Sequence, residues 1–246
     1  VAARSGARVV IVTVPVPIED PAQVVESVLA AVTPNTRLAL IDHITSPTGM
    51  VLPVVEIVRA LDARGVDTLV DGAHAPGMVP LDLDTLGAAY YTANCHKWVC
   101  APKVAAFLHV RRDRQTSLRP VVISHGANAK RPERSRFHLE FDWTGTTDPT
   151  AYLCIPEAIR FMSSLLPGGF AAVMEANRTR AIEGREILQQ ALGANALCPT
   201  SMIGSLAAVK LPEGRASNAL SLYGDPLQDR LFERHAIEVP IVPWPA

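Results

Sequence analysis

The sequence predicts an α/β fold: a large domain with a three-layer, mixed and mostly parallel sheet, followed by part of a smaller α+β domain. Two observations lead to this prediction. Short β-branched or apolar runs alternate with segments of helical spacing over the first two-thirds of the chain, as in sheets covered by helices on both faces. The chain has 246 residues, 48% of them apolar, which is enough for one large domain and part of another.

Strands are expected wherever a short run is rich in Val, Ile, Leu or aromatic residues. Several of these runs are continuous enough to be buried on both faces of a sheet. The runs cover residues 9–14, 37–44, 67–70, 88–92 and 104–110. Because helical segments separate the early runs, the strands are expected to form a parallel or mixed sheet.

Two helices are expected between these strands. The first, residues 21–32, has Asp20 as a possible N-cap and Pro21 at its first position, where a missing N–H costs little. The second has apolar residues at positions i, i+3, i+4 and i+7 on one face, and it ends at Gly65. Those apolar residues are Val54, Ile57, Val58 and Leu61.

The chain changes character near residue 166, where the second domain is expected to begin. A helix opened by Asp148 and Pro149 is expected to run to about residue 166, bent or split by Pro156. A Pro-Gly-Gly sequence then interrupts the chain. The further elements expected are a helix over 170–192, a strand over 205–211 and a helix over 227–235. The predicted domains are residues 1–166 and 167–246.

Both ends of the sequence look cut. Val1 begins the chain without methionine, and residues 237–246 begin an apolar stretch that stops without a terminating helix. We therefore expect a fragment that lacks an N-terminal part of the large domain and a C-terminal part of the small domain.

Charge and composition exclude several classes of protein. The formal net charge is −1 with both signs interspersed, so no basic surface for nucleic acid is expected. No run of apolar residues is long enough to span a membrane. The cysteines are scattered rather than spaced as a disulfide framework, which favours a reducing compartment and a cytoplasmic location. They are Cys95, Cys100, Cys154 and Cys198.

Chemically informative segments follow three of the predicted strands. They cover residues 42–49, 70–77 and 92–98, and the last two contain Asp71 and Lys97. Binding sites in open α/β sheets lie beyond the carboxyl ends of the strands. An acid and a lysine at neighbouring strand ends suit a cofactor that has a basic ring nitrogen and an aldehyde.

Pyridoxal-5′-phosphate (PLP) is such a cofactor, and it acts as an electron sink for amino-acid chemistry. A carboxylate at position 71 would keep the pyridine nitrogen protonated, and the amine of Lys97 would hold the aldehyde. His74 could reach the phenolic oxygen, and Asn94 and His96 could donate to the phosphate. Taken singly, each residue has a plainer structural interpretation: a turn-forming acid, a solvated lysine or a packed histidine.

Residues 70–77 and 94–98 resemble the cofactor core of the class V aminotransferase family, which belongs to the fold type I PLP enzymes. The family pattern is an Asp-Gly-Ala-(His/Gln) strand end followed by a His-Lys pair, and Lys97 lies 26 positions after Asp71. The resemblance implies that Asp71 contacts the pyridinium and Lys97 forms the Schiff base. It also implies that His74 lies near the phenolic oxygen and that Asn94 and His96 contact the phosphate. Many relatives have serine at the position of Asn94.

Two further segments extend the resemblance. Residues 143–149 are similar to the family's Gly-Thr loop, which implies that Thr146 reaches the phosphate of the partner subunit in a homodimer. Ser46 stands where many relatives have an asparagine that touches the ring. His-Lys-Trp and Trp-Thr-Gly-Thr resemble the isopenicillin N epimerase-like branch. Relatives also carry a phosphate loop, a ring-stacking aromatic residue and a carboxylate-binding arginine outside this chain, so the isolated chain is expected to bind PLP weakly or not at all.

The resemblance implies an enzyme that acts on the Cα or Cβ of an amino acid, with Lys97 and His74 as catalytic residues. Epimerisation, transamination and loss of a β-substituent all stay open. The alternatives are a C–S lyase or cysteine desulfurase, a non-catalytic α/β binding protein, and an inactive fragment. No cysteine, however, lies in a late loop like that of the desulfurases. A metal site at Cys95, His96 and Cys100 lacks zinc-ligand spacing, and no metal is expected. The PLP interpretation requires Asp71 and Lys97 to face a shared cavity.

Overall fold

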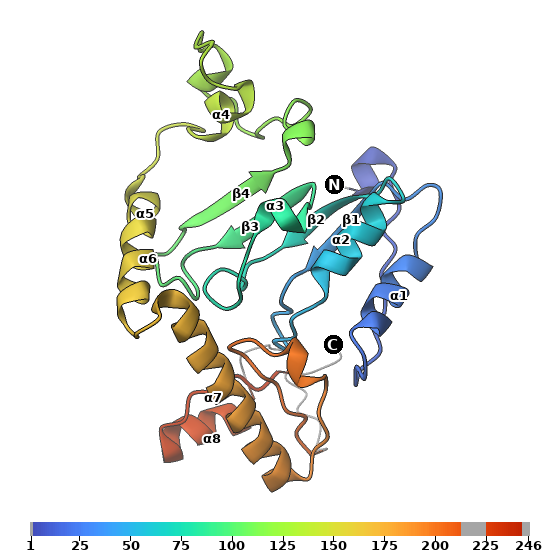
Figure 1. Ribbon diagram of the computed structural model, residues 1–246, viewed down its shortest axis with the longest axis vertical. Helices are drawn as coiled ribbons and strands as arrows, with labels where there is room; N and C mark the ends of the chain where they lie inside the picture. Colours follow the sequence, from blue (N-terminus) through green and yellow to red (C-terminus); the bar gives the residue numbers. More distant parts are fainter. Residues whose placement is uncertain (1, 213–224, 243–246) are drawn as a thin grey trace.

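The computed structural model describes residues 2–212 and 225–242 and contains one four-stranded sheet (Figure 1). The strand order is β1-β2-β3-β4, so each strand pairs with the next one along the chain. The first three strands are parallel and the fourth is antiparallel to β3, which confirms the mixed, mostly parallel sheet. The strands are β1 (Leu38–Asp42), β2 (Asp67–Asp71), β3 (Tyr90–Asn94) and β4 (Ala106–Val110).

The register brings the ends of the strands together at one edge of the sheet. Asp42 of β1 pairs with Asp71 of β2, and Asp71 pairs with Thr92 of β3. Because β4 runs in the opposite direction, it begins at this same edge, where Ala106 pairs with Asn94. The segments that follow β1, β2 and β3 therefore start side by side.

Eight α-helices and four short 3-10 helices accompany the sheet in the described part of the chain. The α-helices are α1 (Ala22–Ala30), α2 (Val54–Asp62), α3 (Leu83–Leu86), α4 (Arg136–Phe141), α5 (Thr150–Leu153), α6 (Ile155–Ser164), α7 (Gly169–Leu192) and α8 (Pro226–His235). The 3-10 helices are η1 (Ala2–Ser5), η2 (Arg112–Arg114), η3 (His125–Ala127) and η4 (Thr200–Met202).

The helices over 21–32, 54–61, 170–192 and 227–235 are confirmed to within a few residues by α1, α2, α7 and α8. The apolar residues predicted for one face of α2 are all buried, between 0% and 3% exposed. The helix expected over 148–166 is split, as Pro156 predicted: α5 ends at Leu153, and the proline lies in the first turn of α6. The short helices α3 and α4 were not foreseen.

One face of the sheet is covered by helices. Val70, Tyr91 and Ala93 point into a cluster with residues of α2 and α3, and all three are no more than 1% exposed. A second cluster joins α1, α2 and the inward residues of β1 to Met202 and to one side of α7. These two clusters form most of the core that supports the strand ends.

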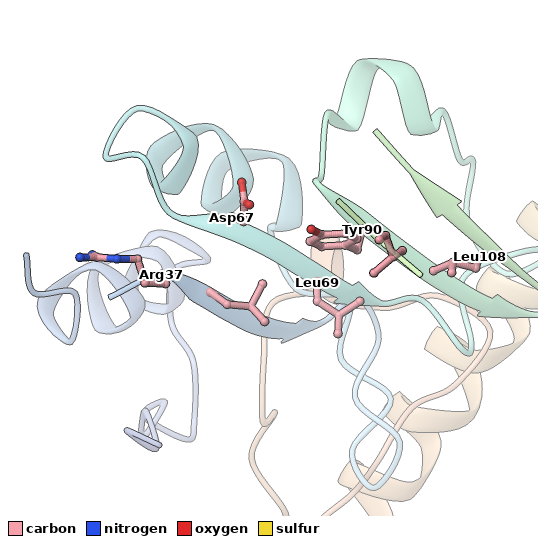
Figure 2. A pocket seen from close by; sticks show the side chains of 7 residues that line it. Arg37, Asp67, Leu69, Tyr90 and Leu108 are labelled. Atoms are coloured by element: carbon pink, nitrogen blue, oxygen red, sulfur yellow. The ribbon is translucent and has the colours of Figure 1, made fainter. Parts of the chain in front are cut away.

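The other face of the sheet, termed the open face, leaves apolar side chains exposed in the described part of the chain, and Figure 2 shows Leu69, Tyr90 and Leu108 on it. Leu38, Leu40 and Leu108 are 52%, 67% and 42% exposed. Side chains of all four strands and of Leu118 line a shallow hollow of about 490 Å³ there. The prediction that 37–44 forms a buried strand is therefore wrong in its burial, because β1 is an edge strand with only Ala39 and Ile41 packed against the core.

Two of the predicted strands are not formed. Residues 9–14 and 205–211 have no assigned strand, although both are rich in β-branched or apolar residues. In the first, Val12 and Val14 pack against the core while Val9 and Ile11 are 71% and 88% exposed. In the second, Leu206 packs against the core without a neighbouring strand. Apolar alternation provides a face to bury in both cases, but a strand also needs a hydrogen-bonded partner.

The predicted domain boundary after residue 166 stays a prediction. Gly168 and Gly169 have φ values of 97° and 73°, and they make the turn between α6 and α7 at this point. Ala246, where the predicted apolar stretch stops, lies outside the described residues, as do residues 213–224. In residues 2–212 and 225–242, no helix combines the length and the apolar character that crossing a membrane requires.

Candidate active site at the carboxyl edge of the sheet

Asp71 is the last residue of β2 and is half-buried. Its Oδ1 accepts a hydrogen bond of 2.9 Å from the backbone N–H of Ala73, so the carboxylate also shapes the turn that follows the strand. Side chains alternate between the two faces of a strand. Asp71 therefore lies on the open face, opposite to the buried Val70. Its negative charge, together with the larger effect of burial, raises the pKa of Asp42 on the neighbouring strand.

Lys97 lies in the loop that connects β3 to β4. This loop is held by backbone hydrogen bonds from Cys95 N to Ala105 O at 2.8 Å and from Ala101 N to Cys95 O at 3.0 Å. The side chain of Lys97 is half-buried, and its Nζ lies 3.0 Å from Nε2 of His74. The loop thus directs the amine toward the segment that follows β2.

His74 contacts Lys97 and is affected by the charge of Asp71. Its Nε2 contacts Lys97, and its Nδ1 accepts a hydrogen bond of 3.4 Å from the indole Nε1–H of Trp98. Burial and the positive charge of Lys97 lower the pKa of His74, while the negative charge of Asp71 opposes this shift. Both charged groups therefore act on one imidazole, and the sequence segments 70–77 and 94–98 meet in space.

Close packing holds the two segments against each other. Gly77 has a φ of 81°, and a Cβ atom there would lie 2.7 Å from the backbone carbonyl carbon and oxygen of Trp98. It would also lie 2.9 Å from the ring of Phe170, at the start of α7. A side chain at position 77 would push the segment that carries His74 away from the segment that carries Lys97.

A buried His43–Tyr91 pair lies beneath the strand ends. Nδ1 of His43 and the hydroxyl of Tyr91 are 2.8 Å apart, and the rings meet edge to face. Burial lowers the pKa of His43 to about 4 and, with the charge of Asp71, raises the pKa of Tyr91. A Cβ atom on Gly72 would lie 2.1 Å from the Tyr91 hydroxyl oxygen. The tyrosine therefore packs directly under the residue that follows Asp71.

The expected phosphate ligands lie on the same edge. Asn94 is the half-buried last residue of β3. His96 contacts the backbone oxygen of Ala105 through Nδ1 at 3.1 Å. A carbonyl oxygen only accepts, so Nδ1 carries a proton. In a neutral imidazole Nε2 is then an acceptor, and only a doubly protonated His96 could donate to a phosphate.

Ser46 and Thr146 are both exposed. Ser46 lies in the loop after β1, at the same edge as Asp71. Thr146 lies in the segment between α4 and α5, which passes along the outer side of β4 (Figure 1). No hydrogen bond between described residues joins Thr146 to Asp71 or Lys97, and its expected role across a subunit interface stays a prediction.

The requirement for a shared cavity stays a prediction. Two surface hollows, one on the open sheet face and one beside α4, are lined by neither Asp71 nor Lys97. Cys95, considered above for a metal site, is buried, whereas Cys100 is exposed. In residues 2–212 and 225–242, no three His, Cys, Asp or Glu side chains gather in a way that could hold a metal ion.

Comparison with known proteins identifies the family of this chain. The family model described as aminotransferase class-V matches residues 1–220. The chain belongs to the class V aminotransferase family. Enzymes of this family depend on PLP. The resemblance carried by residues 70–77 and 94–98 is thereby confirmed at the level of the family.

Two relatives have different names within this family. The isopenicillin N epimerase of Amycolatopsis lactamdurans is 36% identical over 242 residues, which cover 93% of this chain and 58% of that protein. The putative L-cysteine desulfhydrase 1 of Oryza sativa is 36% identical over 219 residues, 85% of this chain and 44% of that protein. The chain spans about half the length of these relatives.

A solved structure supports the fold. The cysteine desulfurase of Thermococcus onnurineus NA1 aligns with a TM-score of 0.67 at 16% identity, over 86% of this chain and 52% of that one. This likeness shows that the chain shares the fold of class V enzymes.

Sequence reasoning missed three residues that lie beside the candidate site. His43, Tyr91 and Trp98 received no role, although Trp98 follows Lys97 directly. The His-Lys-Trp pattern did place an indole N–H directly after the predicted cofactor lysine. The His43–Tyr91 contact joins residues 48 positions apart, and no local pattern indicates such a contact.

Proposed function

We propose that the protein containing this chain is a PLP-dependent enzyme that acts at the Cα or Cβ of an amino acid, with Lys97 as its cofactor-binding lysine. The observation that carries the proposal is the meeting of three groups at one sheet edge. Lys97 Nζ lies 3.0 Å from His74 Nε2, and the charges of both Lys97 and Asp71 act on the same imidazole. Family membership supports the cofactor.

The groups present fit PLP chemically. When bound, PLP draws away the electron pair that remains when a bond at the substrate Cα breaks. Asp71 uses Oδ1 for the Ala73 N–H, which leaves Oδ2 to pair with a protonated ring nitrogen. The amine of Lys97 would attach to the aldehyde, and His74 is close enough to that amine to reach the neighbouring phenolic oxygen.

Proton transfer at the substrate is assigned to Lys97. With an amino-acid substrate bound, the amine of Lys97 would take the proton from the substrate Cα as a general base. The loop between β3 and β4 holds the amine near its starting position, because backbone hydrogen bonds clamp both ends of that loop. Asn94 and His96 are proposed to contact the phosphate and Ser46 the ring. Thr146 is proposed to reach the phosphate of the partner subunit in a homodimer.

Cofactor attachment can be tested on the 246-residue chain with excess PLP, followed by borohydride reduction and mass spectrometry of peptides. Reduction makes even weak attachment permanent, so the test does not require tight binding. We expect the label on Lys97. It should disappear in Lys97→Ala but persist in Lys103→Ala, which removes an exposed lysine of the same loop. Labelling spread evenly over the four lysines, or on other lysines but not on Lys97, would refute the assignment and favour a non-catalytic binding protein or an inactive fragment.

The relatives support two reactions. One is epimerisation at Cα, as in the isopenicillin N epimerase, and the other is C–S bond cleavage, as in the putative L-cysteine desulfhydrase, at equal identity. Exchange of the Cα hydrogen in D₂O without sulfide release supports the first. Release of sulfide from L-cysteine supports the second. Transamination would instead convert an added oxo acid into an amino acid.

A further inference from the structure

We propose that His43 and Tyr91 are positioning residues for Asp71. The buried pair fixes the turn that follows β2 and thereby keeps the Asp71 carboxylate where its free oxygen is available to a protonated ring nitrogen. The use of this carboxylate by a cofactor rests on the proposed function. Its position is a property of the chain alone and can also be measured without the cofactor.

Hydrogen bonds tie the turn after β2 to both neighbouring strands. The backbone oxygen of Asp71 accepts from the N–H of His43, which follows β1, at 2.8 Å. On the other side, the N–H of Gly72 donates to the backbone oxygen of Thr92 in β3, also at 2.8 Å. Within the turn, the N–H of Ala73 donates to Oδ1 of Asp71 at 2.9 Å. Because the carboxylate is bonded to the turn, a movement of the turn also moves the carboxylate.

The hydroxyl of Tyr91 supports this turn from the helix-covered face of the sheet. A Cβ atom on Gly72 would lie 2.1 Å from the hydroxyl oxygen and 2.2 Å from the ring carbon that bears it. The tip of the tyrosine thus fills the space that a side chain at position 72 would need. The charge of Asp71 also contributes, after burial, to the raised pKa of Tyr91, so the hydroxyl lies within the field of this carboxylate.

His43 and Phe107 restrain the tyrosine in turn. Nδ1 of His43 lies 2.8 Å from the Tyr91 hydroxyl, and the two rings meet edge to face with centroids 6.1 Å apart. Phe107 of β4 stacks on the Tyr91 ring at 6.3 Å. Tyr91 is 0% exposed and His43 is 7% exposed. His43 therefore holds the turn twice, directly through its backbone N–H and indirectly through the hydroxyl of Tyr91.

The pair acts on Asp71 through its position and not through a charge. Burial lowers the pKa of His43 to about 4, so the imidazole is neutral at neutral pH. Burial and the charge of Asp71 raise the pKa of Tyr91, so its hydroxyl keeps the proton. Removing the hydroxyl therefore removes no charge. Any effect on a group that contacts the Asp71 carboxylate must then come from movement of the turn.

The ring nitrogen of PLP can report the position of Asp71, because a nearby carboxylate raises the pKa of a pyridinium group. PLP with ¹⁵N in its ring is trapped on the 246-residue chain with borohydride, and the signal that is absent in Lys97→Ala identifies the adduct on Lys97. The nitrogen shift is followed against pH. We expect Tyr91→Phe to lower the pKa of the ring nitrogen by on the order of half a unit, and Asp71→Asn by about one unit or more.

Tyr90→Phe is the matched control. Tyr90 precedes Tyr91 in β3 and lines the hollow on the opposite face, so this change also removes a hydroxyl but should leave the pKa of the ring nitrogen in place. In the double variant Asp71→Asn/Tyr91→Phe, the pKa should equal that of Asp71→Asn, because Tyr91 acts through Asp71. No lowering in Tyr91→Phe, equal lowering in Tyr90→Phe, or additive effects in the double variant would each overturn the proposal.

Two substitutions test the histidine and also serve if Tyr91→Phe does not fold. His43→Gln keeps a polar partner for the Tyr91 hydroxyl, whereas His43→Leu removes it. The pKa of the ring nitrogen should stay close to that of the unsubstituted chain in His43→Gln and fall in His43→Leu about as far as in Tyr91→Phe. The same pKa in both histidine variants would overturn the role of the His43–Tyr91 hydrogen bond.

Hydrogen exchange of the Ala73 amide tests the positioning without the cofactor, because this N–H donates to the Asp71 carboxylate. Tyr91→Phe should accelerate exchange at Ala73 several-fold while leaving Val70, in the middle of β2, unchanged, and Tyr90→Phe should alter neither. Equal acceleration at Ala73 and Val70 would indicate a general loosening of the sheet and overturn the proposal, as would no acceleration. If the unsubstituted chain is never trapped at Lys97, the proposed function fails, and the exchange result alone decides whether the pair holds Asp71.

Discussion

Lowering the pH should destabilise the fold through His43, and the size of this effect follows from its burial. His43 is 7% exposed, and its pKa falls from an ordinary 6.5 to about 4 in the folded chain. The unfolded chain therefore binds a proton at a higher pH than the folded chain does. The stability contributed by the neutral imidazole is complete above about pH 6.5 and is lost as the pH falls toward 4. Between about pH 7.5 and about pH 5, the loss should be about 2 kcal/mol.

Urea denaturation at the two pH values measures this loss, provided that a variant separates His43 from other titrating groups. His43→Gln keeps a polar partner for the Tyr91 hydroxyl but does not titrate. Between the two pH values, its free energy of unfolding should therefore fall by about 2 kcal/mol less than that of the unsubstituted chain. His125→Gln, which replaces an exposed histidine, should behave like the unsubstituted chain. Equal pH dependence in the unsubstituted chain and His43→Gln would show that the imidazole is not buried as a neutral group.

Two further changes test the packing around the site and the open sheet face. Gly72→Ala should lower the free energy of unfolding by about 1–3 kcal/mol in urea denaturation, because its Cβ would lie 2.1 Å from the Tyr91 hydroxyl oxygen; unchanged stability would mean that the tyrosine moves freely. Leu40→Asp, at a position 67% exposed, should change stability by less than about 0.5 kcal/mol and reduce light scattering at high protein concentration. A large loss of stability would show that this face is covered.

Local periodicity predicted the elements whose partners lie nearby in sequence. The spacing of Val54, Ile57, Val58 and Leu61 predicted both the helix and its buried face. The strand ends carrying Asp71 and Lys97 could also be located, because an apolar run followed by polar residues marks the edge of a sheet. The meeting of the 70–77 and 94–98 segments therefore followed from topology.

Other features depend on contacts that no local pattern records. Residues 9–14 and 37–44 look alike as β-branched or apolar runs, yet only the second pairs with another strand. The burial of β1 depends on which residues pack against each of its faces. The composition of the strand does not indicate this. The contacts of Trp98 with His74 and of His43 with Tyr91 depend on side-chain directions after folding, so sequence reasoning assigned the site histidine without finding what orients it.

The exposed leucines of the sheet also affect how this polypeptide behaves in solution. Leu38 and Leu40 lie on β1 and Leu108 lies on β4, on the same face of the sheet, and an exposed apolar face attracts other chains. Aggregation should therefore rise steeply with protein concentration. It would broaden NMR lines and cause slow precipitation during denaturation experiments. Dilute samples, or the Leu40→Asp background, are the appropriate conditions for spectroscopy on this chain.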